Sequence, residues 1–438
     1  MVKNTYYCSE QTMKQYRMIE NLDYEMHHDL AVEYVNDGIV YPLERNICPD
    51  YEQYGGVTDK NGNFIRLSLL DRHIFDHEDA LKPYRDWYIG ANPKYERQDI
   101  KKIDETVVFF GVLYPHYCHA VLEMLSRIWY FLDRPYCKAV YIADPEIKEE
   151  KCFLDFVKAF GFPLENLMRI TQPTRFKQVI IPEQSFRLHD KFHKKHAEVL
   201  NRIKQNLPLK KNDLYQIEKK QHPRQFPLLW IKNKLGLIRP DNYKKIYLLK
   251  DPAFTSQGTP RFSDLHIGKI FKKNGYKLVN PERISVTDVV KILSLCEDLV
   301  AQSGTNAHQI WWMKDKTKLT VLNRSRHACQ IQNTLSQMKD MDTTYIDASF
   351  NPLPVGWMNG PFLMCVTTYL RQFFQDKHFK YKPQKEQAFI KEHLYDFLLL
   401  WAKTNIYGNG RKRLTWDAKE TARDMLQAFS ETNLKEQE

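Results

Sequence analysis

The chain alternates short apolar runs with stretches in which apolar residues recur at helical spacing, most clearly between residues 284 and 313. After Ser285 the apolar residues recur every three or four positions, and Asp288 completes an acidic variant of the capping box, which predicts a short, one-faced helix. An apolar run at 299–301 predicts a strand. Small polar residues follow it, and a second helical pattern comes next. The predicted order is helix, strand, turn, helix.

The turn between that strand and the second helix is Ser303-Gly304-Thr305-Asn306. Such a turn places backbone N–H groups and the positive end of a helix dipole at the carboxyl edge of a sheet, where phosphates bind. An ordinary connection between a strand and a helix has the same composition, and one glycine is weaker than a full glycine-rich fingerprint. Both interpretations stay open.

The same alternation upstream predicts parallel sheets in an α/β fold, because apolar runs separated by amphipathic helices are typical of doubly covered strands. The predicted strands are 107–110, 138–143, 168–170, 178–181, 246–250 and 276–279, and the predicted helices are 116–129, 147–160, 192–206 and 266–274. Earlier, the strands at 38–43, 55–58 and 63–67 flank Asn61-Gly62, which predicts a tight hairpin. Two βαβα halves joined by a linker predict a ligand cleft between them.

A chain of 438 residues is longer than one hydrophobic core usually serves, so we expect several domains. The expected parts are a β-rich N-terminal region at 1–100, Rossmann-like domains at 101–235 and 236–358, and C-terminal helices at 359–438. The helix at 388–401 is apolar on one side and precedes Arg411-Lys412-Arg413. It fits an anionic membrane surface, packing on the first domain, or a dimer contact.

The charge balance is +11, which suits a phosphorylated small molecule, an anionic membrane or a nucleic acid. The most basic stretch, 205–245, lacks the regular aromatic residues of a base-stacking surface, so we expect a bridge between domains and no nucleic-acid partner. The start of the chain has no signal-type apolar region, and we expect a cytoplasmic protein. The eight cysteines form no metal-ligand pattern, so we expect no metal.

Three polar side chains stand out in the predicted helix 116–129. His119, Glu123 and Arg127 are four residues apart and share one face of the helix. They would be costly to bury unless they pair with one another or meet a polar ligand. The spacing therefore predicts either a cleft lining or a buried network.

That helix, which reads HAVLEMLSRIW from His119, resembles the family 61 glycosyltransferases. The hairpin at 55–62 and the order of elements from Leu249 to Met313 resemble the same family, so the likeness covers about residues 50 to 325. These are inverting enzymes that include bacterial capsule and lipopolysaccharide transferases. The resemblance implies a GT-B-like fold with two Rossmann-type domains facing each other across a cleft, a nucleotide-sugar donor, a glycan or lipid-linked saccharide acceptor, and no metal cofactor. The expected cytoplasmic location includes the inner face of the plasma membrane, which the helix at 388–401 and the basic residues after it would fit.

The resemblance also assigns roles to residues of this chain. Lys250 and Arg261 are expected to contact the donor diphosphate, together with the turn from Ser303 to Asn306. On the acceptor side the expected pair is His119 as the general base and Glu123 as its orienting partner, with the reverse order open. The residues expected to support that side are His116 and Arg127.

The turn departs from the family pattern. The family usually carries His-Gly-Ala-Gly-Leu-Thr-Asn there, whereas this chain has Ser303-Gly304-Thr305-Asn306-Ala307-His308-Gln309. His308 either replaces the missing imidazole or has a core or capping role. The alternatives to a transferase are a non-catalytic nucleotide-sugar or glycan-binding relative and, more remotely, a basic nucleic-acid-binding protein. The sequence does not specify the sugar, the linkage or the oligomeric state.

Overall fold

The structure is a computed structural model, and the part of it described here consists of the following residues: 4–45, 53–71, 73–74, 82–83, 100–114, 116–143, 147, 150–250, 262–325, 327–350, 361–382 and 386–405. Two of the sequence-based expectations fall outside these ranges. They concern Arg261 and the basic residues 411–413.

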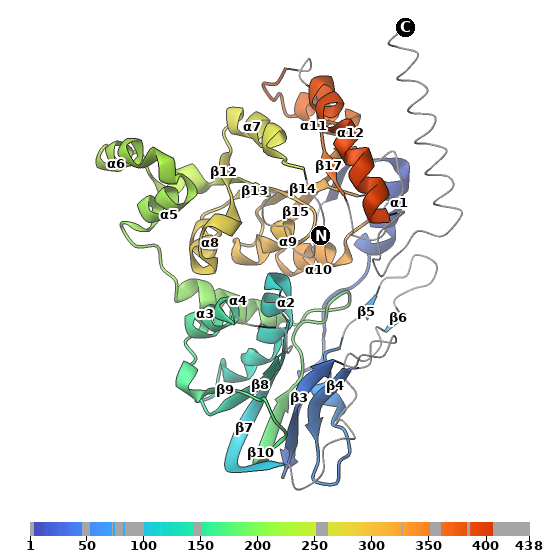
Figure 1. The fold of residues 1–438 in the computed structure, drawn as a ribbon, viewed down its shortest axis with the longest axis vertical. Helices are drawn as coiled ribbons and strands as arrows, with labels where there is room; N and C mark the ends of the chain where they lie inside the picture. The colour runs from blue at the N-terminus through green and yellow to red at the C-terminus, as the bar shows by residue number, and fades with distance from the viewer. Residues whose placement is uncertain are drawn as a thin grey trace.

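Two sheets lie one above the other in an elongated α/β molecule (Figure 1). The upper one, sheet A, is entirely parallel and has the order β1-β15-β14-β13-β11-β12. Its strands are β1 (Asn4–Tyr7), β11 (Lys245–Leu248), β12 (Lys277–Val279), β13 (Asp298–Gln302), β14 (Lys318–Asn323) and β15 (Asp342–Asp347). The helices that accompany it are α1 (Glu10–Glu20), α7 (Leu265–Lys273), α8 (Val286–Leu293), α9 (Thr305–His308) and α10 (Gln330–Met338).

The lower one, sheet B, is mixed and has the order β4-β3-β10-β7-β8-β9, with β2 paired to β10. The parallel part confirms the alternation of strands and helices expected after residue 100. Its strands are β2 (Val32–Asn36), β3 (Ile39–Arg45), β4 (Gln53–Thr58), β7 (Lys101–Leu113), β8 (Ala139–Ala143), β9 (Leu167–Arg169) and β10 (Thr174–Pro182). The helices on it are α2 (Tyr117–Leu122), α3 (Lys151–Phe160) and α4 (Lys194–Gln205), and a 3₁₀ helix, η3, covers Met124–Phe131.

The described N-terminal residues do not form one unit, in contrast to the region expected at 1–100. β1 pairs with β15 in sheet A, and the Tyr16 hydroxyl in α1 donates to Oδ1 of Asn323 at 2.9 Å. Strands β2 to β4 belong to sheet B. Pairing between segments more than three hundred residues apart places β1, which local periodicity does not reveal.

One apolar core joins the two sheets. The indole N–H of Trp312 donates to the Tyr117 hydroxyl at 2.9 Å, and its rings stack on Phe156 at 5.3 Å between centroids. The same buried cluster contains side chains from α2, α3 and α4 of the sheet B side and from α8, η9 (Gln309–Trp312) and α10 of the sheet A side. Buried aromatic packing of this kind holds the carboxyl ends of the two sheets in a fixed relation.

The basic stretch expected as a bridge folds into two helices, α5 (Asp213–Gln221) and α6 (Phe226–Lys234), which project to one side of sheet A (Figure 1). The remaining short strands are β5 (His73–Ile74), β6 (Lys82–Pro83), β16 (Ser349–Phe350) and β17 (Leu363–Met364).

The C-terminal helices α11 (Thr368–Asp376) and α12 (Glu386–Asn405) pack on the sheet A side (Figure 1). The sequence left three alternatives for the helix at 388–401, and packing of its described residues on the first domain is not observed. Phe397 and Trp401 on α12 are buried against Leu363, so the apolar side of this helix has a partner within the chain. None of the described helices has both the length and the apolarity needed to cross a bilayer.

Candidate active site

The first half of the site forms where β7 passes into α2. His116 caps the helix, because its Nδ1 accepts from the backbone N–H of Cys118 at 3.2 Å. The expected helix over 116–129 is not continuous. It ends at Leu122, Glu123 has φ −108° and ψ −50°, and a 3₁₀ helix follows. Residues 119 and 123 nevertheless lie one turn apart.

The imidazole of His119 and the carboxylate of Glu123 form a close pair. Nδ1 of His119 lies 2.5 Å from Oε2 of Glu123, and 29% of the His119 side chain is exposed against 0% for Glu123. A carboxylate only accepts, so Nδ1 carries the hydrogen and Nε2 is the ring nitrogen that has a lone pair for a proton. The rings of His116 and Tyr114 lie 5.1 and 6.1 Å from the His119 ring. The arrangement is that of an accessible base oriented by a buried carboxylate.

Arg127 is buried and has a structural position. Its Nε donates to the carbonyl of Pro182 at 3.0 Å, and its Nη2 donates to the carbonyls of Leu67 and Leu69 at 2.9 and 2.6 Å. It thereby ties the 3₁₀ helix to β10 and to the segment after β4. Of the two interpretations of the polar stripe, Arg127 fits the buried network, whereas His119 lies at an accessible position.

The second half of the site is the turn after β13. Gly304 has φ +99° and ψ −154°, a backbone conformation open almost only to glycine. The side-chain oxygen of Ser303 accepts from the backbone N–H of Arg324 at 3.2 Å, and Nδ2 of Asn306 reaches the carbonyl of Leu249 at 3.5 Å. These two side chains tie the turn to its neighbouring strands, and Thr305 is half-buried.

His308 is buried at the boundary between the two halves. Its Nε2 lies 3.3 Å from the Cys329 thiol, and its Nδ1 lies 3.7 Å from the thiol of Cys118 in α2. Burial, and after it the charges of Arg324, His189 and His116, lower the pKa of His308 to about 3. A neutral, enclosed imidazole favours the core role of the two that the sequence left open.

Arg324 is a candidate that sequence reasoning missed. It follows β14 directly, and a Cβ on Gly304 would lie 3.1 Å from its Nη2, so the guanidinium covers the glycine turn. Its Cζ lies 4.9 Å from the centroid of the Phe362 ring. A cation immediately after a buried parallel strand was the signal that could have found it, because ligands bind outside the carboxyl ends of such strands.

Arg324, His189 and His116 all influence the pKa of His308 electrostatically, so each of them lies near its ring. These residues follow β14, β10 and β7. His189 has φ +59° in the loop after β10. Residues that follow strands of both sheets therefore surround His308, and His116 among them also neighbours His119.

Lys250 follows β11 and forms an ion pair with Glu282. Its backbone N–H donates to Oδ1 of Asp264 at 3.3 Å, and the Tyr247 hydroxyl donates to the other oxygen at 2.9 Å. Burial raises the pKa of Asp264 to about 6. Lys250 thus lies at the expected edge of sheet A with a carboxylate already bound.

Within the described ranges, no three His, Cys, Asp or Glu side chains gather in a way that could hold a metal ion. The expectation of metal-independent chemistry stays a prediction.

Residues 117–320, a little under half of the chain, match the model of the family Glycosyltransferase 61. No curated protein gives a significant match. The matched segment contains His119, Glu123, Lys250 and the turn at 303–306, and it ends before Arg324. The match supports the resemblance to family 61 and a glycosyltransferase activity.

Proposed function

We propose that the chain is an inverting glycosyltransferase of family 61, with a GT-B-like arrangement, that moves a sugar from a nucleotide-sugar donor to the hydroxyl group of a glycan or lipid-linked saccharide. The observation that carries the proposal is the pair formed by His119 and Glu123, with 2.5 Å between Nδ1 and Oε2. The family match over residues 117–320 supports the same class of reaction.

On the acceptor side, the hydroxyl must lose its proton as its oxygen attacks the anomeric carbon. Nε2 of His119 takes this proton, and the Glu123 carboxylate at Nδ1 stabilises the imidazolium that forms. The exposed fractions of the two side chains, 29% and 0%, favour His119 as the base and Glu123 as its orienting partner. His116 supports the acceptor side from 5.1 Å away, measured between ring centroids.

On the donor side, the bond from the anomeric carbon to the diphosphate breaks on the opposite face, which inverts the configuration, and negative charge builds on the leaving group. The guanidinium of Arg324 and the backbone N–H groups of the turn at 304–306 stabilise this negative charge. Lys250 and Arg261 are further diphosphate contacts, and Lys250 must first exchange its partner Glu282. No metal takes part in the proposed step.

We extend the proposal to surface polysaccharide synthesis, either capsule or lipopolysaccharide, on the cytoplasmic side of the plasma membrane. A second candidate function is a non-catalytic nucleotide-sugar or glycan-binding relative. The enclosure of His308 and the use of Ser303 to bind the backbone of Arg324 favour that alternative, because neither side chain is directed at a ligand.

The test uses the full chain with a panel of uridine, guanosine, cytidine and thymidine diphosphate sugars. We expect one nucleotide to raise the melting temperature and its sugar conjugate to be turned over, with nucleoside diphosphate released. Inversion is checked by NMR of the anomeric proton in the product. Stabilisation without turnover on any acceptor would support the non-catalytic alternative, and no stabilisation by any nucleotide would reject both.

A further inference from the structure

A cluster of exposed apolar side chains covers α6 and the residues that follow it. Of the large hydrophobic side chains that the described residues leave exposed, the following are gathered between positions 226 and 237: Phe226, Leu228, Trp230, Ile231, Leu235 and Leu237. Leu235 is 67% exposed and Trp230 is 52% exposed. Isolated exposed apolar residues are common, but a contiguous group marks an interaction surface.

The cluster has a helical organisation. Leu228, Ile231 and Leu235 follow one another at the three- and four-residue spacing of a single helix face, whereas Leu229 is 3% exposed and faces the interior. The outer face of a helix on a globular protein is normally polar. Here Lys232 and Lys234 lie on either side of the apolar stripe, and long lysine side chains can reach past such a stripe to charged groups.

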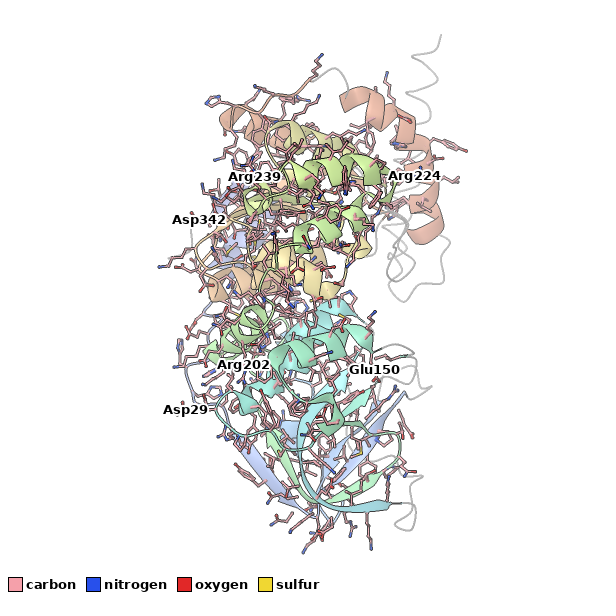
Figure 2. The ribbon with its side chains drawn as sticks, turned by 90° about the vertical axis from the view of Figure 1, so that its left-hand side faces the viewer. Asp29, Glu150, Arg202, Arg224, Arg239 and Asp342 are labelled. Atoms are coloured by element: carbon pink, nitrogen blue, oxygen red, sulfur yellow. The ribbon has the colours of Figure 1, made fainter. Side chains whose placement is uncertain are left out.

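The surroundings of the cluster are strongly basic. Residues 219–245 contain eight Lys or Arg and one acidic residue, Asp241, which is paired with Lys244 at 3.1 Å. A lysine lies over each of the two exposed aromatic rings. Nζ of Lys219 lies 4.9 Å from the centroid of the Phe226 ring, and Nζ of Lys234 lies 5.8 Å from the centroid of the Trp230 ring. In Figure 2 the helices α5 and α6 face the viewer between the labels of Arg224 and Arg239.

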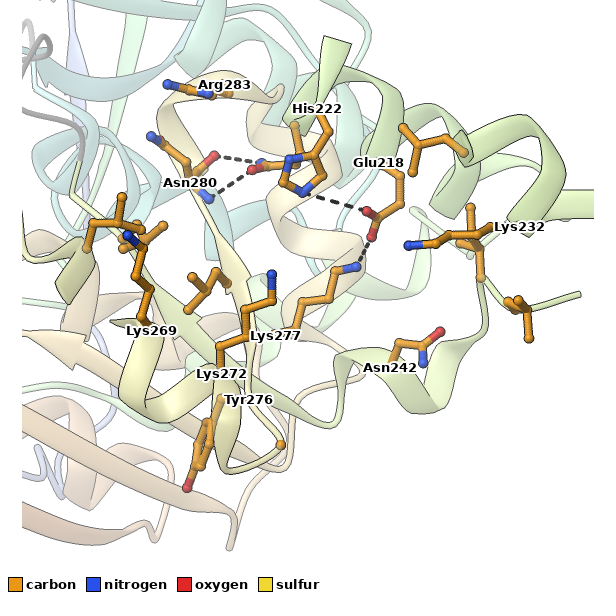
Figure 3. A pocket seen from close by; sticks show the side chains of 18 of the residues that line it. Glu218, His222, Lys232, Asn242, Lys269, Lys272, Tyr276, Lys277, Asn280 and Arg283 are labelled. Atoms are coloured by element: carbon orange, nitrogen blue, oxygen red, sulfur yellow. Dashed lines mark hydrogen bonds and ion pairs between the residues drawn. The ribbon is translucent and has the colours of Figure 1, made fainter. Parts of the chain in front are cut away.

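A basic pocket of about 880 Å³ lies beside the cluster, between α6, α7 and the edge strand β12 (Figure 3). Lys232, Lys269 and Lys272 line it and form no ion pair with any other residue that the structure describes. The pocket's Glu218 is already engaged by Lys277 and by the Tyr243 hydroxyl. Leu237 lines the pocket and is also part of the exposed cluster, so the two features are continuous.

The combination of an apolar stripe with neighbouring lysines favours one class of partner over the others. The centres of protein interfaces are depleted in lysine, and two copies meeting at this face would bring like charges together. A nucleic acid would use the lysines but leave the apolar stripe in water. An anionic bilayer satisfies both parts, since the Leu and Ile side chains of the stripe enter the boundary of the acyl chains while lysines meet the phosphates.

We propose that the surface formed by residues 226–237, together with the lysines of the adjacent pocket, binds the protein to an anionic lipid bilayer. The apolar stripe of α6 enters the interface, and Lys232, Lys269 and Lys272 contact lipid phosphate groups. The membrane surface is thus assigned to α6 rather than to α12, whose apolar side is occupied by Phe397 and Trp401 in a buried cluster.

The test measures flotation of the full chain with phosphatidylcholine vesicles, with and without phosphatidylglycerol. We expect binding that needs phosphatidylglycerol, and a loss of about tenfold in affinity in the variant Leu228→Ser, Ile231→Ser, Leu235→Ser. The variant Lys232→Gln, Lys269→Gln, Lys272→Gln should weaken binding to the anionic vesicles. Its control, Lys101→Gln, Lys102→Gln, Lys177→Gln, removes the same charge from sheet B and should change binding far less.

Each other outcome overturns the proposal. The serine variant could bind as tightly as the parent chain, the two lysine variants could behave alike, or binding could be lost instead in Tyr395→Ser, Leu399→Ser on α12. Light scattering that shows a dimer dissolved by the serine changes, without vesicle binding, would point to a second copy. Unchanged circular dichroism shows that the variants fold. Donor turnover on a soluble acceptor is measured without vesicles, so a failure here leaves the proposed transferase standing.

Discussion

Nδ1 of His119 lies 2.5 Å from Oε2 of Glu123, and only the imidazole of this pair is exposed. The two side chains therefore differ in burial, and this difference distinguishes their expected roles. The buried carboxylate fixes which ring nitrogen carries the hydrogen, and the other nitrogen has the lone pair.

Replacing His119 with Ala should lower kcat for sugar transfer by about 10²–10⁴, because the general base is lost, while donor affinity stays unchanged. Glu123→Gln should give a smaller loss in kcat, since the amide can still orient the ring without stabilising its charge. Steady-state kinetics and calorimetric titration of the nucleotide separate the two effects. His27 also pairs with an acidic residue four positions away, Asp23 at 2.9 Å, and His27→Ala is the matched control. Parent-like kcat in both site variants would remove the pair from the mechanism.

Arg324→Ala should raise the dissociation constant of the nucleotide by about tenfold or more, because a charge-assisted contact to the diphosphate is lost. Gly304→Ala should act in the same direction, since a Cβ there would strain the backbone and come within 3.1 Å of the guanidinium. Arg169→Ala, which breaks a surface pair with Glu150, is the control. An unchanged dissociation constant in Arg324→Ala would contradict the donor role.

Gly111→Ala should lower the free energy of unfolding by about 1–3 kcal/mol through its strained backbone. Gly111 has φ +103°, and a Cβ would lie 2.8 Å from Nη1 of Arg127. Gly62 has φ +91° and nothing within 4 Å of its Cβ position, so Gly62→Ala isolates the backbone part of the cost. Denaturant unfolding should show the larger loss at position 111. Equal losses in the free energy of unfolding at positions 62 and 111 would mean that the Arg127 guanidinium moves away from the new Cβ without destabilising the protein.

The stability of the protein should fall as the pH drops below 6.5. Burial lowers the pKa values of His196 and His308 to about 3 and that of His266 to about 4, so the unfolded chain binds more protons than the native one in this range. At pH 5 each of these three histidines lowers the free energy of unfolding by about 2 kcal/mol relative to neutral pH. Asp264 opposes the trend by about 1 kcal/mol, because its pKa near 6 favours the protonated native state.

Urea unfolding at pH 7.5 and pH 5 measures this difference. His196→Gln should make the loss between the two pH values smaller by about 2 kcal/mol, since one buried imidazole no longer has to stay neutral. An equally large loss in that variant would show that His196 takes up a proton in the native state.

Local sequence signals specified several elements correctly. Ser285 caps α8 by accepting from the backbone N–H of Asp288 at 3.1 Å, and α3 ends at Phe160, where the predicted helix 147–160 ends, before Gly161 with φ +100°. Both features depend on residues within one turn of each other, so the chain alone carries them. The alternation of apolar runs and helices likewise predicted parallel pairing after residue 100.

Other features depend on contacts between distant segments. The sequence placed His119, Glu123 and Arg127 on one helix face, but the carbonyls of Pro182, Leu67 and Leu69 draw Arg127 into the interior. The sequence left two roles for His308, and in the structure Cys329 and, from the side of the other sheet, Cys118 enclose its ring.

The sequence by itself therefore determined the alternation of strands and helices after residue 100, the cap of α8, and the helix that carries His119. The tertiary structure decided which of the polar side chains remain accessible, that β1 joins the sheet formed late in the chain, and that Arg324 lies over the Gly304 turn. The physical reason is range. Caps and periodicity act over a few residues, whereas burial and charge proximity depend on segments that meet only after folding.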